Sequence, residues 1–383
     1  PPLISRVQVQ GRQGRGWMFK INHAVLHVFD FVSCVNVFSE DELDLTNKNV
    51  KSYVMRIARH ALGGMDNRRG EFFSDSGFAA ELSAYFKGER DFIDLSVQVA
   101  QFMSEELGRM ENPSSCDLLV VDFEDQEKPP AMPPLADDAT EGEIAAATAT
   151  AEAAAYNARS EHYFGLLLLE SKPAFMHEVG RGEDGATRNN IERHHAILPN
   201  PSQKIASFAL VNARTMAVQF VDKPRQIAGE ERWLIPDGLL QCSNEASSKE
   251  LFDTTMGLVE EVAEEFGVNS AVAMGRAKAY LAENADDSDE VPFDEFVDEV
   301  FDDEGPRRRF EQAAADEQLG ESVHVERDVV KRVSRNHKIV TDTGIVLTFP
   351  AEYSHNTELI EFKSAPNGLI QIELKNIGSI ENR

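Results

Sequence analysis

The stretch over residues 191–222 constrains the fold most, because it reads as three strands in succession. The first strand is expected over 191–198 and ends before Pro199, since proline cannot donate to a strand ladder. The other two are expected over 204–211 and 216–221, with turn-forming residues between them. Apolar residues alternate along these last two strands, which is typical of a half-buried antiparallel sheet. We therefore expect a three-stranded meander to which earlier strands pair and on which helices pack.

The residues before the meander predict more strands and three helices. Strands are expected over 19–31, 35–38, 117–123, 163–170 and 174–179, the last returning beside the one before it. Helices are expected over 45–62, 76–87 and 91–110, where apolar residues recur at helical spacing. These elements predict an N-terminal α+β domain over 19–222, with an antiparallel or mixed sheet. Residues 1–18 are expected to be a mobile extension. Residues 126–160, rich in proline and then alanine, are expected to be a flexible insertion with a marginal helix over 141–158.

A second domain is expected over 223–383, beginning at Lys223-Pro224. Helices are predicted over 247–266, 269–282, 283–304 and 306–319. The third of these carries twelve acidic residues and no basic one, and its apolar residues recur at helical spacing. The chain then predicts two β-hairpins, with strands over 339–341 and 345–349 and over 359–363 and 369–375. The fold class is therefore α+β, with a helical region ending in β-hairpins.

Several sequence runs resemble those of a known family. The run AILP…SQK over 196–204 follows a predicted strand, and the run INHAVLHVFDF begins at residue 21, near the start of the chain. The C-terminal runs IVLTFPAEY and IEFKSAPNGLIQIELKNIG belong to the same pattern. Together they resemble the bacterial nucleoid-associated protein family of the NdpA type. The resemblance implies a cytoplasmic protein of the nucleoid that binds DNA, and it supplies no catalytic signature.

The charge of the chain limits how it can bind DNA. It has 38 Lys and Arg against 66 Asp and Glu, a net charge of −28. Since non-specific DNA affinity comes largely from cations that replace counterions, the basic residues must gather on one face. The candidates for double-stranded DNA contacts are Arg56, Arg59, Arg68 and Arg69, then Arg193 and Lys204, and finally Arg307, Arg308, Arg309, Lys331, Arg332 and Arg335. The loop 63–70 either grips a phosphate or is an ordinary surface turn. No base-reading motif is present, so little sequence preference is expected.

Two other readings remain open. The acidic helix 283–304 suits a protein-interaction module that meets a basic partner beside DNA machinery. Large apolar residues around Phe252 and Phe293 also suggest a homodimer.

After DNA binding and the protein-interaction module, the third functional reading is a metal-dependent nuclease that uses Asp342, Glu361 and Lys363. The same Glu-x-Lys pattern recurs at 373–375, which favours a solvated hairpin face over a nuclease.

The remaining residues point away from other chemistry. Cys34, Cys116 and Cys242 are widely spaced, which indicates buried thiols in a reducing compartment and no zinc site. His194 and His195 are adjacent in a strand and so point to opposite faces, while His23 and His27 lack an evident third ligand. No apolar run is long enough to span a membrane. We expect a non-enzymatic protein with no cofactor, no metal and no membrane segment.

Overall fold

The chain forms two compact units. The computed structural model describes residues 17–127, 160–181, 187–284, 290–319, 322–324, 327–351, 353, 356–364 and 370–379. The first unit, called here the sheet unit, extends to Glu245, and the second, the helical unit, begins at Ala246. Of the expected extension 1–18, the structure describes the last two residues, which begin the first strand. The helix expected over 141–158 lies outside the described residues.

The sheet unit is built on a seven-stranded antiparallel sheet. In sheet order its strands are β2 (Val35–Val37), β1 (Trp17–Asp30), β4 (Cys116–Glu127), β5 (Ser160–Glu170), β8 (Ser207–Asn212), β9 (Val218–Val221) and β3 (Arg68–Gly70). The central strands are apolar on both sides because helices cover both faces of the sheet. β4 and β5 pair directly from Cys116 to Gln126, although more than thirty residues separate them in the chain. The predicted α+β class with an antiparallel sheet is confirmed.

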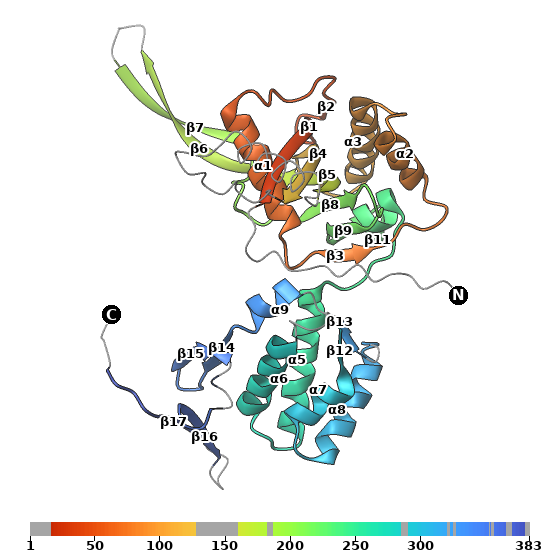
Figure 1. Cartoon of the computed structure of the whole chain (residues 1–383). Helices are drawn as coiled ribbons and strands as arrows, with labels where there is room; N and C mark the ends of the chain where they lie inside the picture. The colour runs from red at the N-terminus through yellow and green to blue at the C-terminus, as the bar shows by residue number, and fades with distance from the viewer. Residues whose placement is uncertain are drawn as a thin grey trace, which may run out of the picture. The chain divides into compact units, whose positions relative to one another are not determined.

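Three helices enclose this sheet (Figure 1). Helix α1 (Lys48–Leu62) packs on one face, and α2 (Gly77–Phe86) and α3 (Phe92–Gly108) pack on the other. Each starts at a residue whose side chain accepts a backbone N–H of the first turn: Asn47, Ser76 and Asp91. The apolar residues that predicted α1 face the sheet: Val54, Ile57, Ala58 and Ala61 are buried, and Val50 is partly buried beside them.

The first strand of the predicted meander belongs elsewhere. β6 (Lys172–Arg181) and β7 (Thr187–Ile197) pair with each other as a separate two-stranded ribbon. The prediction that 191–198 pairs with 204–211 is therefore wrong, as is the prediction that 174–179 returns beside 163–170. Figure 1 shows the ribbon extending away from the sheet.

The division between the units lies later than Lys223. Residues 223–245 form β10 (Pro224–Ile227), β11 (Glu230–Trp233) and a seven-residue π-helix, η1 (Leu234–Leu240). The Arg225 guanidinium is buried against Asp222, 2.6 Å away, and donates to Ser207 on β8 at 2.6 Å. Ile227, Leu234 and Leu240 join the apolar core beneath α2 and α3. This segment therefore folds with the sheet unit, and the chain passes to the helical unit after Glu245.

The helical unit opens on a well-capped helix. α5 (Ser248–Glu265) begins with a capping box in which Ser247 and Glu250 satisfy each other's backbone N–H groups. The elements that follow are α6 (Ser270–Asn284), β12 (Glu290–Pro292), α7 (Phe293–Val300), α8 (Glu304–Asp316), β13 (Ser322–His324) and α9 (Arg327–Val333). The acidic helix predicted over 283–304 is not one continuous helix. Residues 290–292 form β12, and α7 covers only the eight residues from Phe293 to Val300.

The two phenylalanines around which a dimer face was predicted are buried within this unit. Phe252 and Phe293 are 4% and 6% exposed. The rings of Phe293 and Phe296 pack edge-on or tilted against Phe310 of α8, with ring centroids 5.7 Å apart in each case. The faces that suggested a homodimer are therefore covered within the chain. The homodimer stays a prediction without this support, and the mass from light scattering at micromolar concentration tests it.

The C-terminal hairpins are confirmed. β14 (Asn336–Val340) pairs with β15 (Val346–Pro350), and β16 (Ile360–Ser364) pairs with β17 (Ile370–Leu374). The turn at 342–344 has Gly344 at a φ of 86°, a backbone conformation that glycine adopts without strain. The two hairpins are separate two-stranded sheets.

Candidate functional site

The solvent face of α1 gathers four cations. Lys48, Lys51, Arg56 and Arg59 are all exposed, and the helix contains no acidic residue. No ion pair from these four is found within the part of the chain that the structure describes. Arg59 lies in the last turn, where the helix dipole favours a positive charge, and its guanidinium sits 5.2 Å from the Phe19 ring. α1 therefore presents a face of uncompensated positive charge in a chain whose net charge is −28.

Arg68 and Arg69 do not lie in a turn or in a phosphate-binding loop. They form β3 at the edge of the sheet, paired with β9. Arg68 Nε donates to Asn244 Oδ1 at 2.6 Å, and its guanidinium lies 5.5 Å from the Trp233 ring. The backbones of Arg69 and Glu245 are joined by two hydrogen bonds of 3.3 and 2.9 Å. Both arginines thus attach the last residues of the sheet unit to the sheet edge.

Two further candidates differ in their surroundings. Lys204 Nζ is 2.8 Å from Asp66 Oδ2, so its charge is compensated. Arg193 is exposed on β7, and its guanidinium lies 6.0 Å from the Phe175 ring. No carboxylate partner of Arg193 is found among the described residues. Among the described residues, Lys204 therefore has a compensating carboxylate and Arg193 has none.

The basic run on α8 is neutralised within the helical unit. Arg307 pairs with Asp298 at 2.6 Å, and Arg308 pairs with Glu304. Arg309 pairs with Glu261 at 3.2 Å and with Glu265 at 2.9 Å. Of the last three candidates, Lys331 and Arg332 lie on α9 and Arg335 follows it. Among the predicted residues, the structure brings Arg56 and Arg59 together on α1, beside Lys48 and Lys51. The two lysines were not among the candidates. The absence of any carboxylate in residues 48–62 was the sequence signal that could have identified them.

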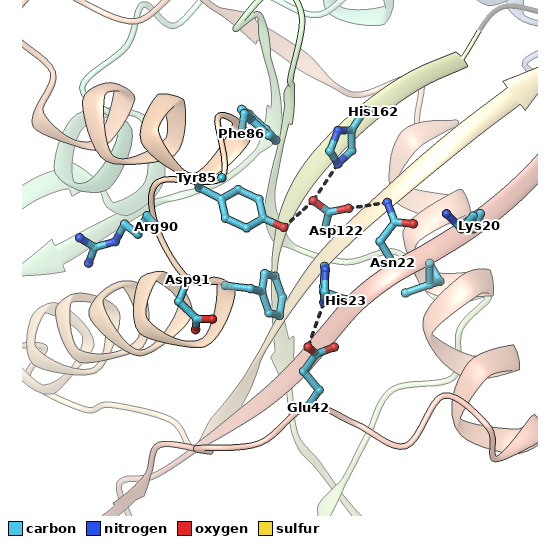
Figure 2. A pocket seen from close by; sticks show the side chains of 13 residues that line it. Lys20, Asn22, His23, Glu42, Tyr85, Phe86, Arg90, Asp91, Asp122 and His162 are labelled. Atoms are coloured by element: carbon cyan, nitrogen blue, oxygen red, sulfur yellow. Dashed lines mark hydrogen bonds and ion pairs between the residues drawn. The ribbon is translucent and has the colours of Figure 1, made fainter.

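A polar cleft of about 650 Å³ opens over strands β1, β4 and β5 of the sheet unit. Its walls come from β1, β4, β5 and the connection between α2 and α3 (Figure 2). At its floor Asp122, 1% exposed, accepts three hydrogen bonds. The donors are Asn22 Nδ2 at 2.8 Å, the Tyr85 hydroxyl at 2.7 Å and His162 Nε2 at 2.7 Å. Asn22 lies where the β1–β4 register shifts, and such bulges redirect side chains.

The charges at the cleft floor are coupled. Burial opposes ionisation of Asp122, but the three hydrogen bonds outweigh it and hold the pKa of this carboxyl below its ordinary value. The hydrogen bond to Asp122 raises the pKa of His162 despite its partial burial. Burial and the same carboxylate raise the pKa of Tyr85, which keeps the phenol protonated. The network therefore joins α2 and three strands through one buried carboxylate.

A second imidazole–carboxylate pair lies at the rim of the cleft. His23 Nδ1 is 2.9 Å from Glu42 Oε1. His27, four residues along β1, is instead buried and contacts Ser96 Oγ and the Ser39 amide. Burial lowers the pKa of His27 to about 4, so it is neutral. Within the described residues, no group of three or more His, Cys, Asp or Glu side chains is placed to hold a metal ion. The side chains of His194 and His195 lie outside that description.

The nuclease candidates belong to different hairpins. Glu361 and Lys363 are 3.3 Å apart, and Lys363 pairs with Glu373 at 2.6 Å across β16–β17. Lys375 also pairs with Glu361, which completes a ladder of alternating charges. Asp342 lies in the turn between β14 and β15. This hairpin ladder accounts for the Glu-x-Lys repeats without a metal.

Among the cysteines, Cys116 and Cys242 are buried as expected, but Cys34 is exposed, because it lies in the turn between β1 and β2.

We expect His162 to stabilise the sheet unit in a pH-dependent way. Because its folded pKa is raised, its contribution is present below about pH 6.5 and is lost as the pH rises through the folded value. The lowered pKa of Asp122 means that its own contribution is lost only when the pH falls through its folded value. His162→Gln should therefore lower the free energy of unfolding more at about pH 5.5 than at about pH 8.5.

Urea denaturation followed by tryptophan fluorescence measures this effect, because Trp17 and Trp233 both lie in the sheet unit. His177→Gln, at an exposed position on β6 in the same unit, is the matched control and should show no such difference. An equal loss of stability at both pH values would contradict the expectation.

The fold and its surfaces define an acidic α+β protein with a basic helical face on its sheet unit. A family model described as nucleoid-associated protein YejK matches residues 25–381, and the chain belongs to this family. The match spans both units and confirms the resemblance seen in the sequence. A search of curated proteins finds no match. No helix in the described parts of the chain has the length and apolar character needed to cross a bilayer.

Proposed function

We propose that this protein binds double-stranded DNA in the bacterial nucleoid, with little sequence preference and without catalysing a reaction on it. The face of α1 carries the proposal: Lys48, Lys51, Arg56 and Arg59 are exposed without carboxylate partners in the described chain. Membership of a nucleoid-associated family supports it. Contacts of lysine and arginine with phosphates position a protein on the duplex and carry no sequence information.

The acidic total charge is compatible with this proposal because the charges are segregated. Long-range repulsion between the chain and DNA is screened over about 10 Å at 0.1 M salt. At shorter distances the local charges decide the interaction. The cations of α1 would then attract the phosphates, since no carboxylate lies on the same helix. By contrast, the arginines of α8 already form ion pairs with Asp298, Glu304 and Glu265. Binding is therefore expected through the sheet unit.

Fluorescence anisotropy with a mixed-sequence duplex over a salt series tests the proposal. Each phosphate contact makes the slope of log affinity against log salt more negative by about 0.9, so four contacts from α1 predict a slope of about −3.6. Scrambling the duplex sequence should leave the affinity unchanged. Absence of binding at low salt would overturn the proposal.

A second candidate function rests on the solvent face of α7. Asp294, Glu295, Asp298 and Glu299 are all exposed there, and Arg307 compensates one of them. This face suits a basic protein partner that acts beside DNA. Binding of a lysine-rich peptide, weakened by Asp294→Asn with Glu299→Gln, would support this function. Binding that is indifferent to these substitutions would exclude α7 as the docking surface.

A further inference from the structure

The β6–β7 ribbon has two chemically different faces. In an antiparallel pair, cross-strand partners share a face, and successive pairs alternate between faces. Phe175 pairs with Arg193, His177 with Ile191, and Val179 with Asn189, so these six share one face. Met176 pairs with Glu192 on the opposite face. Of the ribbon side chains that the structure describes, those on the first face include no carboxylate. This acid-free face is the subject of the inference.

The acid-free face is both apolar and exposed. Phe175 is 73% exposed, Val179 64% and Ile191 73%. Apolar side chains gathered on one face of a ribbon are costly to leave in water and mark an interaction surface. An isolated two-stranded hairpin is itself only marginally stable. The Arg193 guanidinium lies 6.0 Å from the Phe175 ring, so a cation and an aromatic ring form one unit on this face.

The base of the ribbon is fastened to α1. The Tyr53 hydroxyl on α1 donates to the carbonyl of Pro199, two residues after β7, at 3.0 Å. Leu198 packs against the same apolar cluster that α1 covers. Figure 1 shows the ribbon rising beside α1. The ribbon that carries the acid-free face is thus attached at its base to the helix that carries the uncompensated cations.

We infer that the acid-free face of the ribbon enters the minor groove of the DNA duplex while α1 contacts the phosphates, which rests on the DNA-binding function proposed above. Arginine is the side chain favoured in a narrow minor groove, and apolar wedges between base steps bend the duplex. Phe175 and Ile191 supply the wedge, and Arg193 enters the groove beside it. The ten residues of β6 extend about 33 Å, close to one helical turn of DNA.

The chemistry favours DNA over a second copy of the chain as the occupant. Two acid-free faces packed together would bring their Arg193 groups into one interface without a carboxylate to balance them. The minor groove offers negative potential for Arg193 and base edges for the apolar side chains. Minor-groove readout is degenerate, which agrees with the weak sequence preference expected.

DNA bending by the full chain tests the inference. A duplex of about three helical turns with a donor and an acceptor dye at its ends should show increased energy transfer when the protein binds. Phe175→Ser with Ile191→Ser should abolish this increase and reduce the affinity about tenfold. Arg193→Gln, a milder change at an exposed position, should reduce affinity in the same direction. Netropsin, which fills the minor groove of A·T tracts, should compete with the wild-type protein.

Met176→Ser is the matched control, because Met176 is 51% exposed on the opposite face. It should bend DNA as the wild type does. Unchanged bending by both ribbon variants, with wild-type binding intact, would overturn the inference and leave the α1 proposal standing. A fall in molecular mass on Phe175→Ser with unchanged DNA binding would assign the face to a second copy. Failure of the wild-type protein to bind any duplex would overturn the proposed function itself.

Discussion

Replacing Lys51, Arg56 and Arg59 with glutamine should weaken DNA binding by about 500-fold at 0.1 M salt. Each lost phosphate contact removes the release of about 0.9 counterion, which at this salt concentration is worth nearly tenfold in affinity. The slope of log affinity against log salt should become shallower by about 2.7 for the same reason. All three side chains are exposed and carry no ion pair in the described chain, so the fold should survive. Fluorescence anisotropy over a salt series measures both quantities.

A matched triple substitution separates this effect from total charge. Replacing Arg307, Arg308 and Arg309 with glutamine removes the same three positive charges. These side chains are already paired with carboxylates of the helical unit, so the salt slope should stay close to that of the wild type. Equal losses from the two triples would mean that net charge, and not the face of α1, governs binding.

Replacing Arg225 with methionine should destabilise the sheet unit by about 3–5 kcal/mol. Arg225 and Asp222 are buried together, and their side chains are 5% and 0% exposed. Removing the cation leaves the Asp222 carboxylate without its counter-charge, although it keeps the hydrogen bond from the Ile235 amide at 2.8 Å. Urea denaturation followed by tryptophan fluorescence measures the loss, since Trp233 belongs to the segment that Arg225 anchors.

Two further variants test the physical reason for this loss. Lys223→Met removes a neighbouring cation whose ion pair with Glu170 is exposed, and it should cost no more than about 1 kcal/mol. Adding Asp222→Asn to Arg225→Met should recover part of the stability, because it removes the buried charge left behind. If the single and double variants were equally destabilised, the buried charge would not be the cause.

The helices of the sheet unit were predictable because their signals are local. α1 has a capping asparagine, an apolar stripe and a glycine directly after its last residue, and all lie within a short window of sequence. α2 and α3 likewise begin at capping residues, Ser76 and Asp91, and carry apolar residues at helical spacing. The buried strands β4 and β5 were predictable from their continuous apolar runs, since a strand covered on both faces needs no polar alternation.

The partner of a strand was not predictable in the same way. Residues 191–197 have the period of two that any strand has, whichever neighbour it pairs with. The structure pairs them with β6, and this pairing makes the ribbon and its two faces. The boundary at Lys223 failed for a related reason. A Lys-Pro step looks like a linker locally, but the buried contact of Arg225 with Asp222 and Ser207 ties the following residues to the sheet.

The sequence by itself determined the α+β class, the positions of the main helices, and Arg56 and Arg59 among the cations of the proposed DNA-binding face. Tertiary structure alone decided which of those cations remain uncompensated, because a carboxylate such as Glu261 reaches Arg309 from 48 residues away in the chain. It also assembled the cleft, where Asp122 meets Tyr85 and His162 from positions 37 and 40 residues distant. Periodicity and capping depend on neighbours along the chain. Charge compensation and buried networks depend on neighbours in space, and the fold supplies these.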